Sequence, residues 1–308
     1  MDQRLLLIYN PFAGTGSFKE RLGDVVDIFV KGGFAVEVYP TQSPGDGARK
    51  AAAPGILPDI IVAAGGDGTL DEVVTGILKS GNHIPLGYIP VGSTNDFAAT
   101  LGLSGNIIEA AGDILGGEER FIDIGLFNNR FFVYVAAFGA FTEVSYGTNQ
   151  SMKNFFGHSA YLFEGLRHIG DIKSYAMEVT IGSRKVSGEF IYGMVTNSLS
   201  IGGMKNLTGK NILLDDGLFE ITLIRRPKNP IELQEIAGSL ILGNAESRLV
   251  ETFRAPSVSI SAEKEVAWTL DGEYGGSFKE ARLVNMSRSI GLLLDEERGQ
   301  KEVLQTGK

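Results

Sequence analysis

Two patterns of hydrophobic and polar positions divide the chain. In the first part, short apolar runs alternate with segments whose apolar residues recur every three or four positions. The runs predict buried strands, and the recurring positions predict amphipathic helices. Strands are expected at residues 5–9, 34–39, 59–63 and 84–91, and helices at 17–31, 44–53, 70–78, 96–101 and 106–115. Repeated strand–helix units of this kind predict a mainly parallel sheet with helices on both faces.

Beyond Arg120 the chain changes to short strands separated by turn residues. A hairpin is predicted around Asn128-Asn129, because strand-like runs lie on both sides of this pair. Further strands are expected at residues 175–181, 185–195, 217–225, 257–261, 266–270 and 281–284, and helices at 152–168 and 230–242. Successive strands with turn signals predict an antiparallel second domain, either a sandwich or a barrel.

Composition limits the class of protein. A chain of 308 residues is long enough for two domains of ordinary size. With 43% hydrophobic and 21% charged residues, it has a globular composition and ample material for a core. Because there is no cysteine, disulfides, zinc–thiolate sites and thiol nucleophiles are excluded. The formal net charge of -9 argues against nucleic acid as a partner, since nucleic-acid binding needs a basic footprint.

No targeting or membrane-spanning segment is expected. The apolar run after Arg4 is too short for the hydrophobic region of a signal peptide. The longest apolar stretch, Phe131 to Phe141, is about half as long as a helix that crosses a bilayer. The sequence therefore predicts a cytoplasmic protein whose contact with membranes would be transient and peripheral.

The segment Gly65-Gly66-Asp67-Gly68-Thr69 joins a predicted strand to a predicted helix. Three glycines allow a sharp bend and a close approach of the backbone to a ligand. The helix N-terminus that follows offers free N–H groups and a positive dipole end to an anion. A carboxylate within an anion site requires a cation, so Asp67 indicates a magnesium nucleotide rather than bare phosphate.

Two further loops occupy corresponding places. Residues 10–16 and 92–96 each follow a predicted strand, and both are rich in Gly, Asn, Thr and Asp. In open parallel sheets, ligands bind at the carboxyl ends of the strands. Three such loops at the same edge of one sheet predict a single binding site.

Several familiar catalytic signatures are missing. The chain has no P-loop motif, no dinucleotide-binding G-x-G-x-x-G in the first turn, no nucleophile elbow and no H-E-x-x-H zinc motif. His83, His158 and His168 lack the spacing of metal ligands, so they are interpreted as ordinary surface or core residues.

Two later segments carry carboxylates at turns. Asp215 and Asp216 precede a strand; they are either turn residues or ligands of a hard cation, together with backbone carbonyls. Asp271 and Glu273 flank Gly272 at the end of another strand. The second pair is interpreted either as part of a hairpin turn or as a source of a general base.

These segments together resemble the bacterial diacylglycerol kinase family, whose catalytic domain is related to those of sphingosine and ceramide kinases. The resemblance runs along nearly the whole chain and rests on Asn10-Pro11 with Gly14, Gly65–Thr69, Gly92–Asp96, Asp216–Leu218 and Leu270–Glu273. Gly-Gly-Asp-Gly-Thr is shared with NAD kinases. Gly-Ser-Thr-Asn-Asp followed much later by Leu-Asp-Gly-Glu is characteristic of the lipid kinase branch.

The resemblance implies a fold. Residues 1–122 and 289–308 would form a nucleotide-binding α/β domain with a mainly parallel sheet, similar to phosphofructokinase and NAD kinase. Residues 123–288 would form an antiparallel β-sandwich domain for the lipid substrate. The last strand, residues 290–294, would return to the first domain, and the nucleotide would bind in the cleft.

The resemblance also implies ATP and Mg²⁺ as cofactors and a set of site residues. Those lining the nucleotide site would be Asn10, Pro11, Gly14, Thr41, Gly65, Gly66, Asp67, Gly68, Thr69, Glu72, Thr94 and Asn95. Relatives often carry a basic residue in the first glycine turn, where this chain has Thr15-Gly16. Phosphate charge would then be neutralised by Mg²⁺, by backbone N–H groups or by Lys19.

The metal and catalytic residues follow from the same resemblance. Asp67, Asp96 and Asp123 would organise the catalytic Mg²⁺, partly through water. A second, structural Mg²⁺ would be bound by Asp216 with the carbonyl groups of Leu213 and Leu218. The general base would be Asp271, with Glu273 as the alternative, because motif matching does not decide between them.

The expected function is the ATP- and Mg²⁺-dependent phosphorylation of a lipid alcohol at a membrane surface, with diacylglycerol as acceptor and phosphatidic acid as product. An NAD kinase-like phosphotransferase and a non-catalytic nucleotide sensor are the alternatives. Acyl chains would need an apolar groove around Phe131, Phe132, Phe138, Phe141 and residues 155–163, unless these aromatic residues belong to the core. The sequence leaves a homodimer open.

Overall fold

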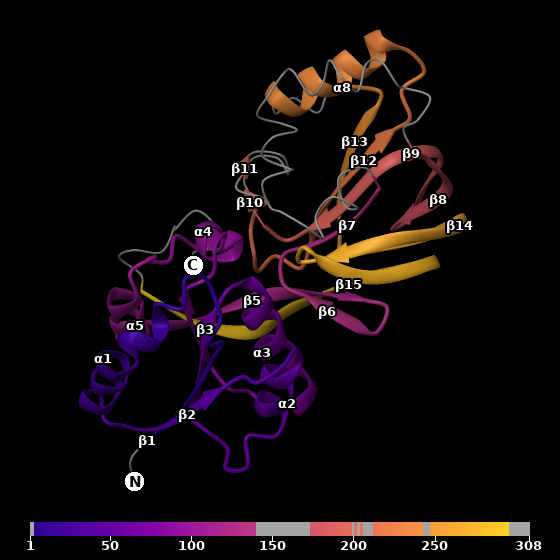
Figure 1. The fold of residues 1–308 in the computed structure, drawn as a ribbon. Helices are drawn as coiled ribbons and strands as arrows, with labels where there is room; N and C mark the ends of the chain where they lie inside the picture. Colours follow the sequence, from indigo (N-terminus) through magenta and orange to yellow (C-terminus); the bar gives the residue numbers. More distant parts are fainter. Residues whose placement is uncertain are drawn as a thin grey trace. The chain divides into compact units, whose positions relative to one another are not determined.

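The computed structural model describes residues 3–139, 173–198, 200–201, 204–205, 212–242 and 247–295. The chain divides into two compact units, which Figure 1 draws in the colours of the sequence. The first unit comprises Met1–Ile124 and Ser287–Lys308, and the second comprises Gly125–Met286. The sequence places these boundaries at residues 122/123 and 288/289.

The first unit is built on a parallel sheet. Its strands are β1 (Gln3–Tyr9), β2 (Phe34–Pro40), β3 (Ile60–Gly65), β4 (Leu86–Pro90) and the end of β15 (Glu273–Leu294). The order across the sheet is β15-β4-β3-β1-β2. The pairing of β15 with β4 is parallel, with Leu292 opposite Leu86. The late segment thus joins the first unit's sheet, where the resemblance expects it.

Helices cover this sheet on both faces, as Figure 1 shows. On one face lie α1 (Phe18–Lys31) and α5 (Ile107–Gly116), and on the other lie α2 (Asp46–Ala52) and α3 (Asp67–Ser80). A short helix, α4 (Asp96–Leu101), follows β4. Buried apolar side chains of α1 and α5 pack on β1, β3 and β4, which explains why these three strands read as continuous apolar runs.

The second unit is mainly antiparallel. Its longer strands are β5 (Glu118–Phe127, which begins in the first unit), β6 (Arg130–Phe132), β7 (Val135–Gly139), β8 (Tyr175–Ile181), β9 (Arg184–Thr196), β12 (Phe219–Arg225), β13 (Val250–Ala255), β14 (Ser257–Leu270) and most of β15. Two short strands, β10 (Ser200–Ile201) and β11 (Met204–Lys205), pair with each other. One helix, α8 (Pro230–Leu242), lies between β12 and β13 in the sequence.

Four strands of the second unit, β7, β9, β8 and β14, pair in a closed ring. One half of β9 pairs with β8 and the other half with β7, and β14 divides in the same way between β8 and β7. The core inside these strands is rich in aromatic residues. Trp268 packs against Phe127 and Phe138, with ring centroids 4.9 Å apart in both pairs.

Several sequence predictions are corrected by the structure. The segments 257–261 and 266–270 are parts of the single strand β14, and 281–284 and 290–294 are parts of the single strand β15. Strand β13 was not predicted. Ser17 precedes α1, but its side chain makes no capping hydrogen bond. The predicted helix at 152–168 lies outside the described residues. None of the helices that the structure describes is long and apolar enough to cross a bilayer.

Candidate active site

Three glycine-rich loops converge at the carboxyl edge of the first unit's sheet. Gly14 adopts a left-handed backbone (φ +55°), and a Cβ atom there would lie 2.2 Å from the carbonyl oxygen of Val91. A Cβ atom on Gly92 would lie 2.5 Å from the Cα atom of Gly66. Only glycine permits such close approach of one backbone to another. The loops after β1, β3 and β4 therefore form one surface, as their positions in the sequence predict.

Asp67 lies at the centre of this surface. Gly66 is the N-cap of α3, so Asp67 is the first residue of that helix. Its carboxylate accepts hydrogen bonds from the backbone N–H of Asp96 at 3.1 Å and of Phe97 at 3.4 Å. These two N–H groups begin α4. Asp67 therefore joins the N-termini of two helices, where a negative charge is favoured.

The electrostatics of this surface favour a cation. Burial raises the pKa of Asp67 to about 6, although the two N–H bonds act against the rise. The nearby carboxylate of Asp96, which is itself buried, raises the pKa further. Two close carboxylates in a desolvated place repel each other, and a bound cation would stabilise both in their ionised form.

Asp123, the third predicted acidic residue, has a different partner. It is fully buried on β5, and its carboxylate accepts a hydrogen bond of 2.7 Å from the backbone N–H of Arg288. Arg288 has a left-handed backbone (φ +51°), which this bond helps to hold. Within the described part of the chain, no three acidic or histidine side chains gather as a metal cluster. A Mg²⁺ ion here would therefore take several of its ligands from water and from a nucleotide.

Two predicted nucleotide residues shape the loops themselves. The side-chain oxygen of Asn10 accepts the N–H of Phe12 at 2.9 Å. Asn95 has a left-handed backbone, and its side-chain amide bonds both the N–H and the carbonyl of Gly92 at 2.9 Å. Such local bonds fix the turn conformations in which Asn is favoured.

The other predicted nucleotide residues differ in how they are placed. Pro11, Gly68 and Thr94 lie half-buried in the loops or at the start of α3, and Gly65, Thr69 and Thr41 are buried. The carboxylate of Glu72 accepts the N–H of Gly45 at 2.6 Å and of Gly47 at 2.9 Å. These two bonds stabilise the start of α2.

The turn between β14 and β15 carries the two candidate bases. Asp271 has a left-handed backbone (φ +49°) and is 8% exposed. Its carboxylate accepts backbone N–H groups from Val133 at 2.5 Å, Tyr134 at 3.0 Å and Val135 at 2.9 Å. Glu273, two residues later, is exposed. The structure therefore binds the first carboxylate within the protein and presents the second to solvent.

The predicted structural metal residue, Asp216, belongs to a charged cluster in the second unit. One oxygen of its carboxylate accepts the N–H of Leu218 at 3.0 Å, and the other accepts Nη2 of Arg254 at 2.5 Å. Nε of Arg254 also donates to Glu220 at 3.1 Å. The side chains of Asp216 and Glu220 are only 9% and 7% exposed.

This cluster holds two buried carboxylates and one guanidinium. Burial raises the pKa of Glu220 to about 7; Arg254 acts against the rise and the charge of Asp216 adds to it. When both carboxylates are ionised, the cluster has one negative charge in excess, so these residues fit a bound cation. Sequence reasoning did not single out Glu220 among the carboxylates of this segment, and it missed Arg254, because Arg254 comes from a strand distant in the sequence.

Comparison with known proteins finds relatives of one family. Residues 4–127 match the family model of the diacylglycerol kinase catalytic domain. A diacylglycerol kinase of Bacillus subtilis (strain 168) is 32% identical over 303 residues, which cover 97% of this chain and 99% of the relative. One from Staphylococcus saprophyticus is 32% identical over 307 residues, covering 99% of this chain and 100% of the relative.

The chain belongs to the diacylglycerol kinase family. It is a lipid kinase, as its relatives are. A solved structure of a diacylglycerol kinase from Bacillus anthracis shares the fold, with a TM-score of 0.76 and 21% identity. That comparison covers 96% of this chain and 98% of the other.

The lipid groove expected for this kinase is corrected in part. Phe132 and Phe138 are fully buried: Phe132 stacks on Phe219, and Phe138 packs against Trp268. Both belong to the core of the second unit and cannot line an open groove. Phe131 is half-buried, and Phe141 and residues 155–163 lie outside the described part of the kinase.

Proposed function

We propose that the protein transfers the γ-phosphoryl group of ATP to a lipid alcohol in a Mg²⁺-dependent reaction, with diacylglycerol as the acceptor. The convergence of the three loops around Asp67 carries this proposal, because it gathers backbone donors and acidic side chains at one place. The names of the relatives support diacylglycerol as the acceptor.

The loops of the first unit would bind the nucleotide phosphates. The first N–H groups of α3 have no acceptor within the helix, so they can donate to an anion at its N-terminus. Asp67 and Asp96 would hold Mg²⁺, which neutralises phosphate charge when it is bound. Phosphoryl transfer is mostly a matter of positioning and charge neutralisation, so these fixed groups supply most of what it requires.

Lys19 would add a positive charge at the first loop. Its amine lies 5.1 Å from the ring centroid of Phe12, and Phe12 is 80% exposed in that loop. A cation–π contact of this kind holds a flexible lysine in one region. Lys19 would then supply the positive charge that relatives often carry in the glycine turn itself.

Glu273 is the better candidate for the general base. A carboxylate that accepts three N–H bonds, as Asp271 does, is stabilised as an anion and has its oxygens occupied. Glu273 is exposed and two residues away. In this proposal Glu273 accepts the proton of the acceptor hydroxyl. The oxygen of that hydroxyl attacks the γ-phosphorus, and ADP leaves. Asp271 fixes the turn that presents Glu273.

A structural cation in the second unit is part of the same proposal. The excess negative charge of Asp216 and Glu220 over Arg254 supports it. Bound near Asp216 with the carbonyl groups of Leu213 and Leu218, the cation would stabilise the start of β12.

The decisive test is a transfer assay with [γ-³²P]ATP against a panel of lipid alcohols in mixed micelles, with NAD as a further acceptor. We expect labelled phosphatidic acid from diacylglycerol, abolished by EDTA. Labelling of NAD without labelling of any lipid would establish the NAD kinase alternative. ATP binding without turnover on any acceptor would establish a nucleotide sensor.

A further inference from the structure

A buried tyrosine on β4 contacts the start of the Gly65–Thr69 loop. Tyr88 lies on β4 and is 3% exposed. Its hydroxyl donates to the carbonyl oxygen of Gly65 at 3.3 Å, and the same oxygen accepts the backbone N–H of Val91 at 2.9 Å. The carbonyl that begins the Gly65–Thr69 loop is therefore held by two donors from the neighbouring strand and its end.

Holding this carbonyl fixes the direction of an N–H group. The C=O of Gly65 and the N–H of Gly66 belong to one planar peptide and point in opposite directions. Glycine gives little steric resistance to rotation of a peptide plane, so a Gly65–Gly66 peptide needs outside support to keep one orientation. Because Gly66 is the N-cap of α3, its N–H lies among the donors assigned above to phosphate.

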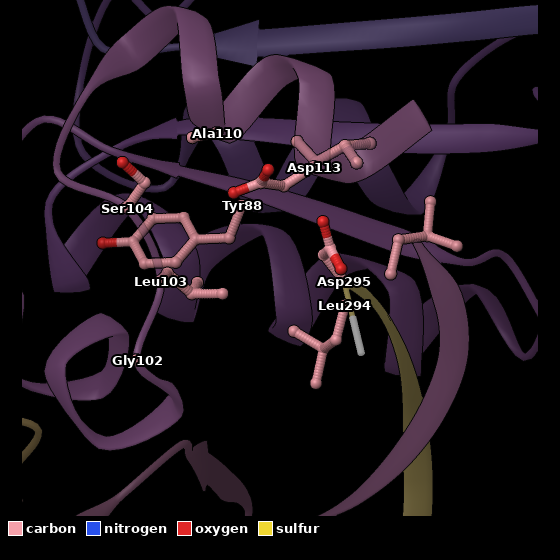
Figure 2. A pocket seen from close by; sticks show the side chains of 10 residues that line it. Tyr88, Gly102, Leu103, Ser104, Ala110, Asp113, Leu294 and Asp295 are labelled. Carbon is pink, nitrogen blue, oxygen red and sulfur yellow. The ribbon is translucent and has the colours of Figure 1, made fainter. Parts of the chain in front are cut away.

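The surroundings of Tyr88 indicate that its hydroxyl, rather than its ring, makes the specific contact with the loop. The ring lines a small pocket with apolar residues (Leu103, Ala110 and Leu294) and polar ones (Ser104, Asp113 and Asp295), which Figure 2 shows around it. The apolar neighbours would pack a phenylalanine ring as well as a tyrosine ring. Burial, and then the charge of Asp67, raise the pKa of Tyr88, so the hydroxyl remains a donor at physiological pH.

We propose that Tyr88 is a positioning residue for phosphate binding: by bonding the Gly65 carbonyl, it aims the Gly66 N–H at the nucleotide phosphates. The inference deepens the proposed function and rests on its assignment of the phosphates to this loop. A tyrosine within an apolar strand is an ordinary sequence feature, so nothing in the sequence alone indicates the role.

The test uses Tyr88→Phe, which removes only the hydroxyl, with Tyr9→Phe as the matched control. Tyr9 is a buried tyrosine on β1 of the same sheet, packed against Phe18. Binding of ATP and of adenosine is measured by calorimetry, and KM is measured for ATP and for the lipid. We expect Tyr88→Phe to weaken ATP binding by about 5-fold, the weight of one net hydrogen bond. Adenosine binding and the KM for lipid should stay unchanged, since neither depends on the phosphates.

Three results would overturn the proposal. They are equal ATP affinity in Tyr88→Phe and the wild type, an equal loss for ATP and adenosine, and the same ATP-specific loss in Tyr9→Phe. The binding experiment needs no turnover, so it also decides the role of Tyr88 if no acceptor is phosphorylated and the proposed function fails.

A second variant separates the hydroxyl from the ring. Tyr88→Ala opens space beside the pocket, and added phenol or toluene can enter a cavity whose walls are mainly apolar. We expect phenol to restore part of the ATP affinity and toluene to restore none. Equal rescue by both compounds would show that packing, rather than the hydrogen bond, supports the loop, and would reject the proposal.

Discussion

The two units each hold a pair of buried or half-buried carboxylates, and the negative charges of the two pairs are balanced by different groups. In the first unit, the carboxylate of Asp67 accepts the backbone N–H groups of Asp96 and Phe97. In the second unit, Asp216 and Glu220 share the guanidinium of Arg254. A backbone dipole orients a carboxylate without cancelling its charge, whereas an arginine cancels one full charge. Under the proposed function, the first pair would therefore need an external cation, whereas the second has a partial substitute within the chain.

The largest expected effect concerns Asp67. Asp67→Asn keeps the shape of the side chain but removes its charge, so we expect kcat to fall by at least about 10²-fold, the usual cost of losing a preorganised electrostatic group. Asp24→Asn on α1, where Asp24 is exposed, is the control and should keep wild-type activity. Loss of less than about tenfold would mean that Asp67 does not hold the catalytic cation.

The second prediction separates the two candidate bases. Glu273→Gln should lower kcat by about 10²-fold or more, the low end for a positioned base, while melting temperature and ATP binding stay unchanged. Glu280→Gln, an exposed glutamate on the same strand, is the matched control.

Asp271→Asn should act in a different way. It replaces an anion that three N–H groups bind, so we expect a lower melting temperature as well as lower activity. If Asp271→Asn lost activity at an unchanged melting temperature and Glu273→Gln stayed active, Asp271 would be the base after all.

The third prediction tests the cation in the second unit. Arg254→Met leaves two buried carboxylates without their guanidinium; because Arg254 is half-exposed, we expect a loss of about 1–2 kcal/mol, or roughly 2–8 °C in Tm. Added Mg²⁺ should raise the melting temperature of this variant more than that of the wild type. Arg248→Met, which removes an exposed partner of Glu232, should show no such gain. Melting temperatures that ignore Mg²⁺ in every variant would reject a structural cation.

The smallest expected effect is a pH dependence of stability. The folded protein raises the pKa of Glu220 from 4.5 to about 7, so ionised Glu220 opposes folding at alkaline pH and protonated Glu220 does not. Stability from this group is full below pH 4.5 and is lost as pH rises through about 7. Glu220→Gln should therefore melt at a higher temperature than the wild type at pH 8, and the difference should shrink toward pH 5. A difference in melting temperature that stays constant from pH 5 to pH 8 would contradict a raised pKa of the buried Glu220 carboxylate.

The fold of the first unit could be predicted well from the sequence. Its strands are buried on both faces, so they appear as apolar runs, and glycine-rich loops mark their carboxyl ends. The rule that ligands bind at this edge then brings residues 10–16, 65–69 and 92–96 together, and the close contacts of Gly14 and Gly92 agree. Such features are local in sequence or follow from a general rule of topology.

Other features could not be predicted, because they join distant residues. The bonds of Asp271 to residues 133–135, of Arg254 to Asp216 and of Tyr88 to Gly65 depend on tertiary pairing that no local pattern encodes. Strand β13 was missed for a related reason. It pairs only with β12 among the named strands, and the residues between its buried ends are exposed or half-buried. A strand at a sheet edge lacks the long apolar run of a central strand.

The path of β15 has a consequence for the synthesis of the protein. This strand pairs with β4, yet the residues that do so are made only after the whole second unit has been synthesised. Until then, a nascent first unit carries an unpaired edge at β4, whose five residues are all buried in the finished fold. Open apolar edges invite pairing with other chains, so the newly made protein passes through a stage at which chaperones would be needed most.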